Sequence, residues 1–226
     1  TSTVFKRFRP RSLALSADNT KLYIVTWYRT GITIVDLANG NAITVVEPFG
    51  PDHHGNGGIV ASPDGAYLYI GGANNGGREM IMRVSTSDFS TFTEMGSGAD
   101  ACTGSWCNMA INHDGSVLTI GQSNRGCIRS MDTSTKVVSD VAGVCGSPCS
   151  DAASCVDGPA EQATFKLPHA VTLDPTGPGT PIWVINRIGG LRMIESTLAQ
   201  SASAIEDPHL TNIRGERFDV WALGEL

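Results

Sequence analysis

Three histidines and one arginine carry the most suggestive chemistry in this sequence. His53 and His54 are adjacent within a glycine-rich stretch, and His169 directly follows a proline, as Arg11 does. Imidazole is a common zinc ligand, and three imidazoles around one open coordination position make a catalytic zinc site. The guanidinium of Arg11 would suit an anionic substrate, because its planar fork of donors matches a carboxylate. His53, His54 and His169 are the candidate metal ligands, with zinc or calcium as the ion, and Arg11 is the candidate for orienting the substrate.

Six cysteines form the second group of reactive side chains. They are Cys102, Cys107, Cys127, Cys145, Cys149 and Cys155. An even number of cysteines in a segment rich in Gly, Ser and Ala predicts up to three disulfides and an oxidising compartment. The sequence leaves the pairing open, although Cys145 with Cys149 or Cys155 would close a short loop, as would Cys102 with Cys107. The Cys-x4-Cys and Cys-x3-Cys spacings match a structural zinc site poorly.

The elements that must position these residues form a repeat that occurs four times. Each copy has a short apolar strand, a tight turn and a second apolar strand, as in GIVASPDGAYLYIGG at residues 58–72. The turns lie at Asp18, Asp64, Asp114 and Thr176, so the copies follow one another at intervals of 46, 50 and 62 residues. The cysteine-rich segment lengthens the last interval. Internal repeats of this period indicate a repeat architecture.

Each copy is expected to contain further strands. Third strands are expected at Ile32–Asp36, Met80–Val84, Ile128–Asp132 and Leu191–Glu195, and fourth strands at Ala42–Val46, Thr91–Met95 and Lys136–Val141. Four short strands in about 40 to 50 residues are typical of a β-propeller blade. A sandwich of unrelated hairpins is the weaker alternative, because the turn residues recur in register. We therefore predict an all-β β-propeller of four-stranded antiparallel blades, with four or five blades or as part of a larger ring.

The domain prediction is a single propeller over residues 1–226. Its repeats lie near 10–46, 56–95, 106–143 and 156–195, and residues 1–9 and 205–226 are the candidates for ring-closing strands. Ring closure would protect the sheet edges. In a propeller, the segments that lead into the first strand of each blade converge at one mouth of the central channel. The residues expected there are Arg11, His53, His54, Cys107 and His169.

The fourth repeat resembles the NHL family of propeller repeats. The residues that carry this resemblance are Asp157, Gly158, Phe165, Pro168, Val171, Leu173, Asp174 and Trp183. The first repeat keeps a related approach over residues 8–13, whereas the second and third look as much like surface-layer and lactonase-type propellers. The resemblance implies architecture and does not imply an activity. NHL-like amidating lyases use channel histidines to bind a metal, which would assign that role to His53 or His54 together with His169.

The competing interpretation is that these histidines are ordinary loop residues with hydrogen-bond partners at the surface. The first and third repeats lack a histidine at this position, and Cys107 is expected to be oxidised. The sequence also has no Gly-x-Ser-x-Gly elbow and no carboxylate pair with a visible partner. We therefore predict no catalytic residue and no cofactor, and keep the metal site as the alternative.

The composition excludes two classes of partner. A net charge of −6 and an isoelectric point near 5.3 argue against a nucleic-acid partner. No apolar run approaches the roughly 18 residues that would indicate a transmembrane span. The first residues, TSTVFKRFRP, lack the apolar region of a secretory signal, so we expect a mature chain or a segment of a longer protein.

The predicted function is a secreted or surface-exposed, non-catalytic module that binds a protein or a glycan, or has a structural role. Its partners would include other copies or other modules of an extracellular assembly. A disulfide-stapled scaffold that presents loops explains the cysteines and the acidic balance. The first alternative is a metal-dependent lyase or lactonase. The second is an intracellular NHL protein-interaction domain, which the clustered cysteines disfavour.

Overall fold

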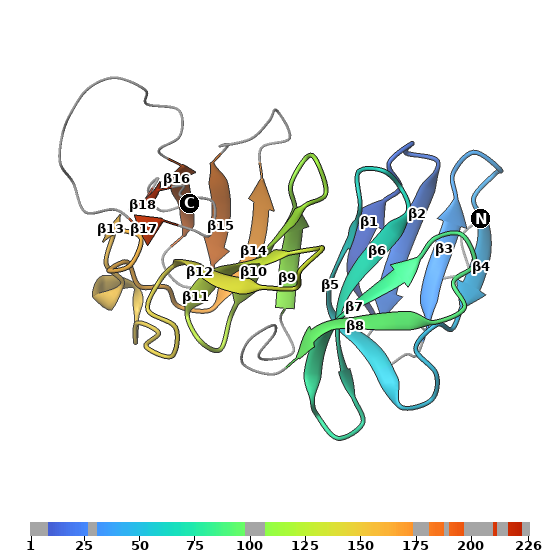
Figure 1. Cartoon of the computed structure of the whole chain (residues 1–226), viewed down its shortest axis with the longest axis horizontal. Helices are drawn as coiled ribbons and strands as arrows, with labels where there is room; N and C mark the ends of the chain where they lie inside the picture. Colours follow the sequence, from blue (N-terminus) through green and yellow to red (C-terminus); the bar gives the residue numbers. More distant parts are fainter. Residues whose placement is uncertain are drawn as a thin grey trace. The chain divides into compact units, whose positions relative to one another are not determined.

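A computed structural model describes residues 9–26, 31–97, 107–173, 181–187, 190–196, 210–211 and 217–222. These residues form β-strands and one short 3-10 helix, η2 (Ala152–Ser154) (Figure 1). The strands build four antiparallel sheets, which are the blades of a β-propeller fold. The predicted all-β class and the four-stranded blades are therefore confirmed. The chain divides into two compact units, Thr1–Cys107 and Asn108–Leu226, and each holds two blades.

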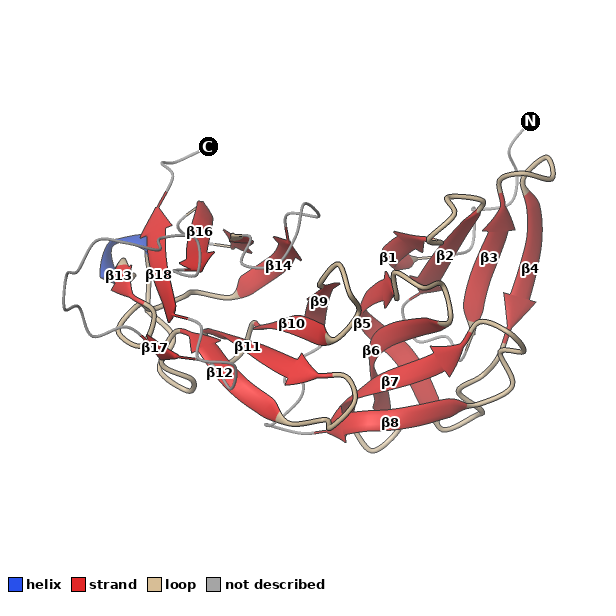
Figure 2. Ribbon diagram, turned by 45° about the horizontal axis from the view of Figure 1, so that its top comes forward, coloured by secondary structure: helices blue, strands red, loops and turns tan. Residues whose placement is uncertain are grey.

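The first unit contains blades I and II (Figure 2). Blade I consists of β1 (Pro10–Leu15), β2 (Lys21–Thr26), β3 (Ile32–Asp36) and β4 (Ala42–Val46). Blade II consists of β5 (His53–Ala61), β6 (Tyr67–Asn74), β7 (Glu79–Ser85) and β8 (Phe92–Ser97). In both blades each strand pairs with the next one along the chain. The expected strands at 32–36 and 42–46 match β3 and β4.

The second unit contains blades III and IV. Blade III consists of β9 (Cys107–Ile111), which begins at the last residue of the first unit, with β10 (Val117–Gln122), β11 (Cys127–Asp132) and β12 (Val138–Ala142). Blade IV consists of β14 (Pro168–Leu173), β15 (Ile182–Asn186), β16 (Leu191–Ser196) and β18 (Arg217–Ala222). The short strands β13 (Gly158–Pro159) and β17 (Leu210–Thr211) both pair with β18.

The turn between the first two strands is built in the same way in blades I and II. Ser16 Oγ and the Thr20 amide donate hydrogen bonds to Asp18 Oδ1, at 2.5 and 3.0 Å. Asp64 Oδ1 accepts the equivalent pair of hydrogen bonds in blade II. The residue after each of these aspartates has a positive φ, which favours Asn or Gly. The recurring Asp-Asn and Asp-Gly pairs therefore fix the turns locally, which explains why the repeat is visible in the sequence.

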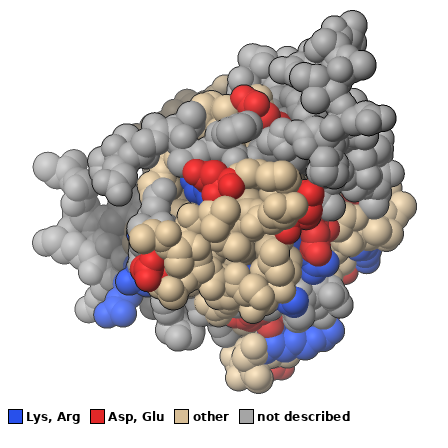
Figure 3. Space-filling model, turned by 90° about the vertical axis from the view of Figure 1, so that its left-hand side faces the viewer, with Lys and Arg blue, Asp and Glu red and all other residues tan. Residues whose placement is uncertain are grey.

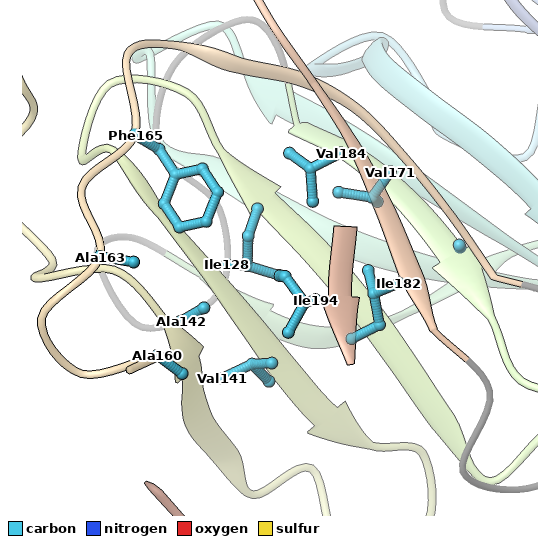
Figure 4. Packing of buried hydrophobic residues seen from close by; sticks show 11 residues of the cluster. Ile128, Val141, Ala142, Ala160, Ala163, Phe165, Val171, Ile182, Val184 and Ile194 are labelled. Atoms are coloured by element: carbon cyan, nitrogen blue, oxygen red, sulfur yellow. The ribbon is translucent and has the colours of Figure 1, made fainter. Parts of the chain in front are cut away.

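Apolar side chains fill the space between the two blades of each unit. In the first unit, Val25 and Ile32 of blade I are fully buried in one cluster with Leu68 and Ile70 of blade II. Figure 4 shows the cluster of the second unit, which joins Ile128 of blade III to the apolar side chains of blade IV. Stacking of blades thus buries faces that a single blade would leave in water.

The first strand of blade II is longer than the sequence pattern indicates. The stretch 52–58, expected to be a loop, is mostly strand, because β5 begins at His53 and pairs with the extended end of β6. The fourth position of blade IV is held by β18, which pairs with β16. The other candidate for that position was residues 1–9, of which residues 1–8 lie outside the described part of the chain. In the described ranges, no helix has the length and apolar character needed to cross a membrane.

Candidate functional site

Arg11 and His169 occupy equivalent positions in blades I and IV. The pairing of β1 with β2 is irregular between Pro10 and Ser12, and that of β14 with β15 is irregular between Pro168 and Ala170. Arg11 and His169 are the intervening residues, and such a β-bulge re-aims a side chain near the end of a strand. Both are half-buried. Burial lowers the pKa of the Arg11 guanidinium below its ordinary value.

His53 lies further from the tight turn than these two residues. It is the first residue of β5 and pairs with Asn74. Its ring centroid lies 4.9 Å from that of Phe92, with the planes inclined by 59°. The His53 imidazole therefore packs against an aromatic ring, and this contact explains its position without a metal ion. The side chain of its neighbour His54 lies outside the described part of the structure.

In blade III, Cys107 occupies the position that corresponds to Arg11 in blade I and to His169 in blade IV. It packs against two glycines of blade II. A Cβ atom on Gly57 would lie 2.7 Å from the carbonyl oxygen of Cys107, and one on Gly71 would lie 2.9 Å from the same oxygen. Only glycine permits this approach. Cys107 is disulfide-bonded and therefore has no thiolate to offer a metal. Among the side chains that the structure describes, no three His, Cys, Asp or Glu groups gather closely enough to hold a metal ion.

A shallow pocket of about 220 Å³ lies where the turns of blades I and II approach each other. Asp18, Asp64 and Tyr23 contribute to its lining. The hydrogen bonds that close each turn, from Ser16 first, lower the pKa of Asp18 to about 2. The pKa of Asp64 is lowered for the same reason. The carboxylates therefore stabilise the turns as charged acceptors, which accounts for their recurrence without a ligand.

The cysteines build a more distinctive feature in the second unit. Cys127 is bonded to Cys145, and Cys149 to Cys155. The short loop considered for Cys145, closed by Cys149 or Cys155, is therefore not formed. Cys145 follows β12, which pairs with β11 close to Cys127, and the two Cα atoms lie 5.0 Å apart. The pairing of β11 with β12 therefore brings Cys145 next to Cys127, which is 18 residues away in the sequence. No described cysteine is free.

Residues 144–157, here called the stapled loop, are held by local hydrogen bonds as well as by these disulfides. Asp151 Oδ1 accepts from the amide of Ser154 at 2.9 Å, which is the capping arrangement that starts η2. Ser154 Oγ accepts in turn from the amide of Ser150 at 2.9 Å. The Gly146 amide donates to the Arg125 carbonyl at 2.9 Å, and Pro148 packs on Gly126. The loop is therefore tied to the rest of its unit and to itself at several points along its length.

Arg192 on β16 anchors the end of the stapled loop. Its Nη2 donates to the carbonyl of Val156 at 2.8 Å and to the carboxylate of Asp157. Its Nη1 donates to the carbonyl of Thr164 at 2.5 Å, and its Cζ lies 4.4 Å from the centroid of Phe165. Burial lowers the pKa of Arg192, and the charge of Asp157 opposes that shift. A buried cation thus fastens the loop and the segment that follows it to blade IV.

Most of the stapled loop is exposed to solvent. Val144 and Val156, near its two ends, have relative exposures of 43% and 53%. Hydroxyl groups and the Asp151 carboxylate lie between them in the sequence. On the described part of the face shown in Figure 3, acidic and basic side chains form small separate groups among uncharged ones. Chemically, the loop offers apolar contacts beside hydrogen-bonding groups on a rigid support.

Comparisons with known proteins give a structural likeness. No protein-family model matches the sequence, and no curated protein matches it. An auxiliary nutrient binding protein from Bacteroides thetaiotaomicron matches with a TM-score of 0.61 and 18% identity, over 82% of this chain and 44% of that one. A gluconolactonase from Xanthomonas campestris matches with a TM-score of 0.57 and 14% identity, over 82% and 58%. A chain of the nidogen/laminin complex matches with a TM-score of 0.60 and 12% identity, over 100% and 73%.

These likenesses show the propeller fold alone, because the identities are low and one fold hosts many functions. The chain spans about half the length of the two bacterial proteins that it matches. The NHL assignment of the fourth repeat is therefore narrower than what these comparisons support, which is a propeller.

Arg192 was not among the predicted site residues, although the sequence carries one signal for it. The expected strand Leu191–Glu195 contains a single arginine, two positions before Ile194, which lies in the core of the second unit. Residues two apart in a strand face the same side, so the alternation already placed a cation on an inward face. A buried arginine requires partners, and the carboxylate and carbonyls of residues 156–164 supply them.

Proposed function

We propose that this chain is a secreted or surface-exposed binding module, without a catalytic centre, whose partner is a protein or a glycan. The observation that carries the proposal is the stapled loop, which is exposed to solvent yet crosslinked by two disulfides and anchored by Arg192. Exposed loops on a rigid scaffold are the usual place for recognition residues.

The physical reason is the entropy of binding. A flexible loop loses conformational freedom when it binds, at about 0.5 to 1.5 kcal/mol for each immobilised side chain, whereas a preorganised loop has lost part of it already. The exposed valines at the ends of the loop provide apolar area, and the hydroxyls between them can accept or donate hydrogen bonds. Both a protein surface and a sugar present complementary groups.

Secretion rests on the disulfides, which persist in oxidising compartments. Structural neighbours also support a binding role: one is named an auxiliary nutrient binding protein, and another comes from a complex of nidogen with laminin. The ligands of those proteins are not assigned to this chain, and they guide only the choice of compounds and proteins tested for binding.

Peptide mapping without reduction tests the compartment. We expect linked peptides for Cys127–Cys145 and Cys149–Cys155 in protein purified from its natural source. Free thiols at these positions would remove the secreted assignment.

A binding experiment tests the loop. The full chain is applied to a glycan array and to a panel of purified extracellular-matrix proteins, and the affinity for each hit is measured by surface plasmon resonance. The variant Val144→Asp/Val156→Asp should bind about tenfold or more weakly, because the apolar contacts that the two valines would make with the partner are replaced by charges that must be desolvated. Leu37→Asp, which changes an equally exposed residue of blade I (41%), is the matched control and should bind normally. Equal loss in both variants, or no hit at all, would contradict the proposal.

A further inference from the structure

Three asparagines of this chain are directly followed by glycine, a sequence at which a polypeptide can modify itself. The pairs are Asn39-Gly40, Asn56-Gly57 and Asn75-Gly76. In this reaction the backbone nitrogen of the glycine attacks Cγ of the asparagine side chain, a five-membered succinimide ring forms, and ammonia leaves. Water then opens the ring on either side, and the product is aspartate or isoaspartate. Glycine favours the attack because it has no Cβ to obstruct the ring.

The first pair lies in the turn between β3 and β4, where Asn39 and Gly40 are both exposed. The hydrogen bonds of this turn use the backbone of Asn39. Its amide donates to Asp36 Oδ1 at 3.0 Å, and its carbonyl accepts from the Ala42 amide at 3.2 Å. Within the described ranges, no hydrogen bond engages the Asn39 side chain, and a Cβ atom on Gly40 would have no neighbour within 4 Å. The side-chain amide can therefore rotate toward the Gly40 nitrogen, and the ring has room to form.

The side chain of Asn75, in contrast, is held in place. Its Nδ2 donates to the Pro51 carbonyl at 3.3 Å and to Asp52 Oδ1 at 3.4 Å. A Cβ atom on Gly76 would lie 3.2 Å from Asn74 Oδ1, and a backbone hydrogen bond fixes that oxygen. Attack by the Gly76 nitrogen would have to break the two hydrogen bonds of Asn75 and displace the Asn74 side chain.

The third pair lies within β5, where Gly57 is buried. A Cβ atom on Gly57 would lie 2.7 Å from the Cys107 carbonyl oxygen and 3.1 Å from Gly71 Cα. Backbone atoms thus surround Gly57 closely, and they can move only with their strands. A succinimide at Asn56 would therefore disturb the packing around β5.

We propose that Asn39 is a modification site of this protein, at which water converts asparagine to aspartate or isoaspartate through a succinimide, whereas the fold protects Asn56 and Asn75. Each event replaces an amide by a carboxylate and adds one negative charge to a chain whose net charge is −6. In the isoaspartate product the chain runs through Cγ, so the carbonyl that accepts from the Ala42 amide becomes part of a free carboxylate. The modification therefore changes both the charge of the β3–β4 turn and the hydrogen bond that closes it. This inference is independent of the binding function proposed above.

Storage of the full chain in mildly alkaline buffer, followed by peptide mapping with mass spectrometry, tests the proposal. Asn39 should react about tenfold or more faster than Asn75 and Asn56, because hydrogen bonds and close contacts hold those two pairs away from the geometry of attack. Isoaspartate-specific enzymatic methylation should label the same peptide. The variant Asn39→Gln should lose the reaction, because the longer side chain cannot close a five-membered ring.

Two controls separate the effect of the fold from that of the sequence. All three pairs share the Asn-Gly sequence, so their rates should converge when the chain is unfolded in urea. In the folded chain, Asp52→Ala/Asn74→Ala removes one hydrogen bond of Asn75 and the side chain that crowds Gly76. This variant should react several-fold faster at Asn75 and unchanged at Asn39, and circular dichroism verifies that it is folded. Equal rates at Asn39 and Asn75 in the folded original chain, or an advantage of Asn39 that persists in urea, would overturn the proposal.

Discussion

The guanidinium of Arg192 forms an ion pair with the carboxylate of Asp157, 35 residues earlier in the chain. The two side chains differ in environment: that of Arg192 is 2% exposed, and that of Asp157 is 38% exposed. Arg192 also contacts two backbone carbonyls and the face of Phe165, so it replaces most of its lost hydration with protein groups. The ion pair joins blade IV to the stapled loop.

Replacing Arg192 should therefore destabilise the protein strongly. Arg192→Met keeps much of the volume of the side chain but removes the guanidinium donor of the Thr164 carbonyl and one of the two donors of the Val156 carbonyl, whose other donor is the Thr164 amide. The expected cost is about 2 kcal/mol or more. Urea unfolding measures the free energy. Arg78→Met is the control, because Arg78 pairs with Glu94 at 2.9 Å on the exposed surface, where an ion pair contributes about 1 kcal/mol or less. Equal losses in the two variants would show that Arg192 has no anchoring role.

The two described disulfides should differ in their contribution to stability. Cys127–Cys145 spans 18 residues and Cys149–Cys155 spans 6. The entropy of closing these loops in the unfolded chain corresponds to about 3 and about 2 kcal/mol. Replacing both cysteines of each bridge by alanine, followed by urea unfolding, should reproduce that order. The reverse order would mean that the short bridge stabilises contacts of the folded loop.

Two glycines with similar backbone angles should tolerate alanine very differently. Gly40 has φ of +62° and no atom within 4 Å of the place that a Cβ would take, so Gly40→Ala should cost only the strain of that conformation, about 1 kcal/mol. Gly126 has φ of +66°, and its Cβ would lie 2.6 Å from the Phe165 carbonyl oxygen and 2.7 Å from Pro148 Cα. Gly126→Ala should cost a further 1 to 3 kcal/mol or so, because the stapled loop must move. Thermal unfolding of the two variants checks the difference.

Acid should weaken the fold through the aspartates that cap turns. Hydrogen bonds from the Thr135 amide and from Ser134 lower the pKa of Asp132 from 3.8 to about 2. The folded pKa lies below the unfolded one, so this contribution is fully present above about pH 4 and is lost as the pH falls to about 2. Asp132→Asn should therefore show a smaller fall in unfolding free energy over that range than the original chain. If the unfolding free energy of the variant fell with pH as steeply as that of the original chain, Asp132 would not contribute to the acid sensitivity.

Metal content separates the binding module from the metal-dependent enzyme. We expect elemental analysis of the dialysed protein to find zinc and calcium well below one ion per chain, because Cys107 is oxidised and His53 packs against Phe92. One ion per chain that is removed by His169→Ala, but retained in His113→Ala, would favour the enzyme instead. His113 is the matched control, because it lies in the β9–β10 turn, away from the first-strand bulges.

The tight turns and the strands could be predicted from the sequence, because residues close together along the chain determine them. The pairs Asp18-Asn19 and Asp64-Gly65 predicted tight turns, since hydrogen bonds to the aspartate and a positive φ are properties of a few consecutive residues. The strands around these turns followed from their apolar alternation, and with them the propeller fold.

Other features were decided only by tertiary structure. Leu13 and Ile59 occupy the same position in their repeats, yet Leu13 is exposed and Ile59 is buried, because Ile59 lies in the apolar cluster that blades I and II share. Cys145 pairs with Cys127 because strand pairing brings them together, and sequence distance carries no such information. Arg192 likewise finds its partners across 28 to 36 residues of chain. Short-range patterns determine turns and strands through local energetics, whereas partners depend on which surfaces the folded chain places in contact.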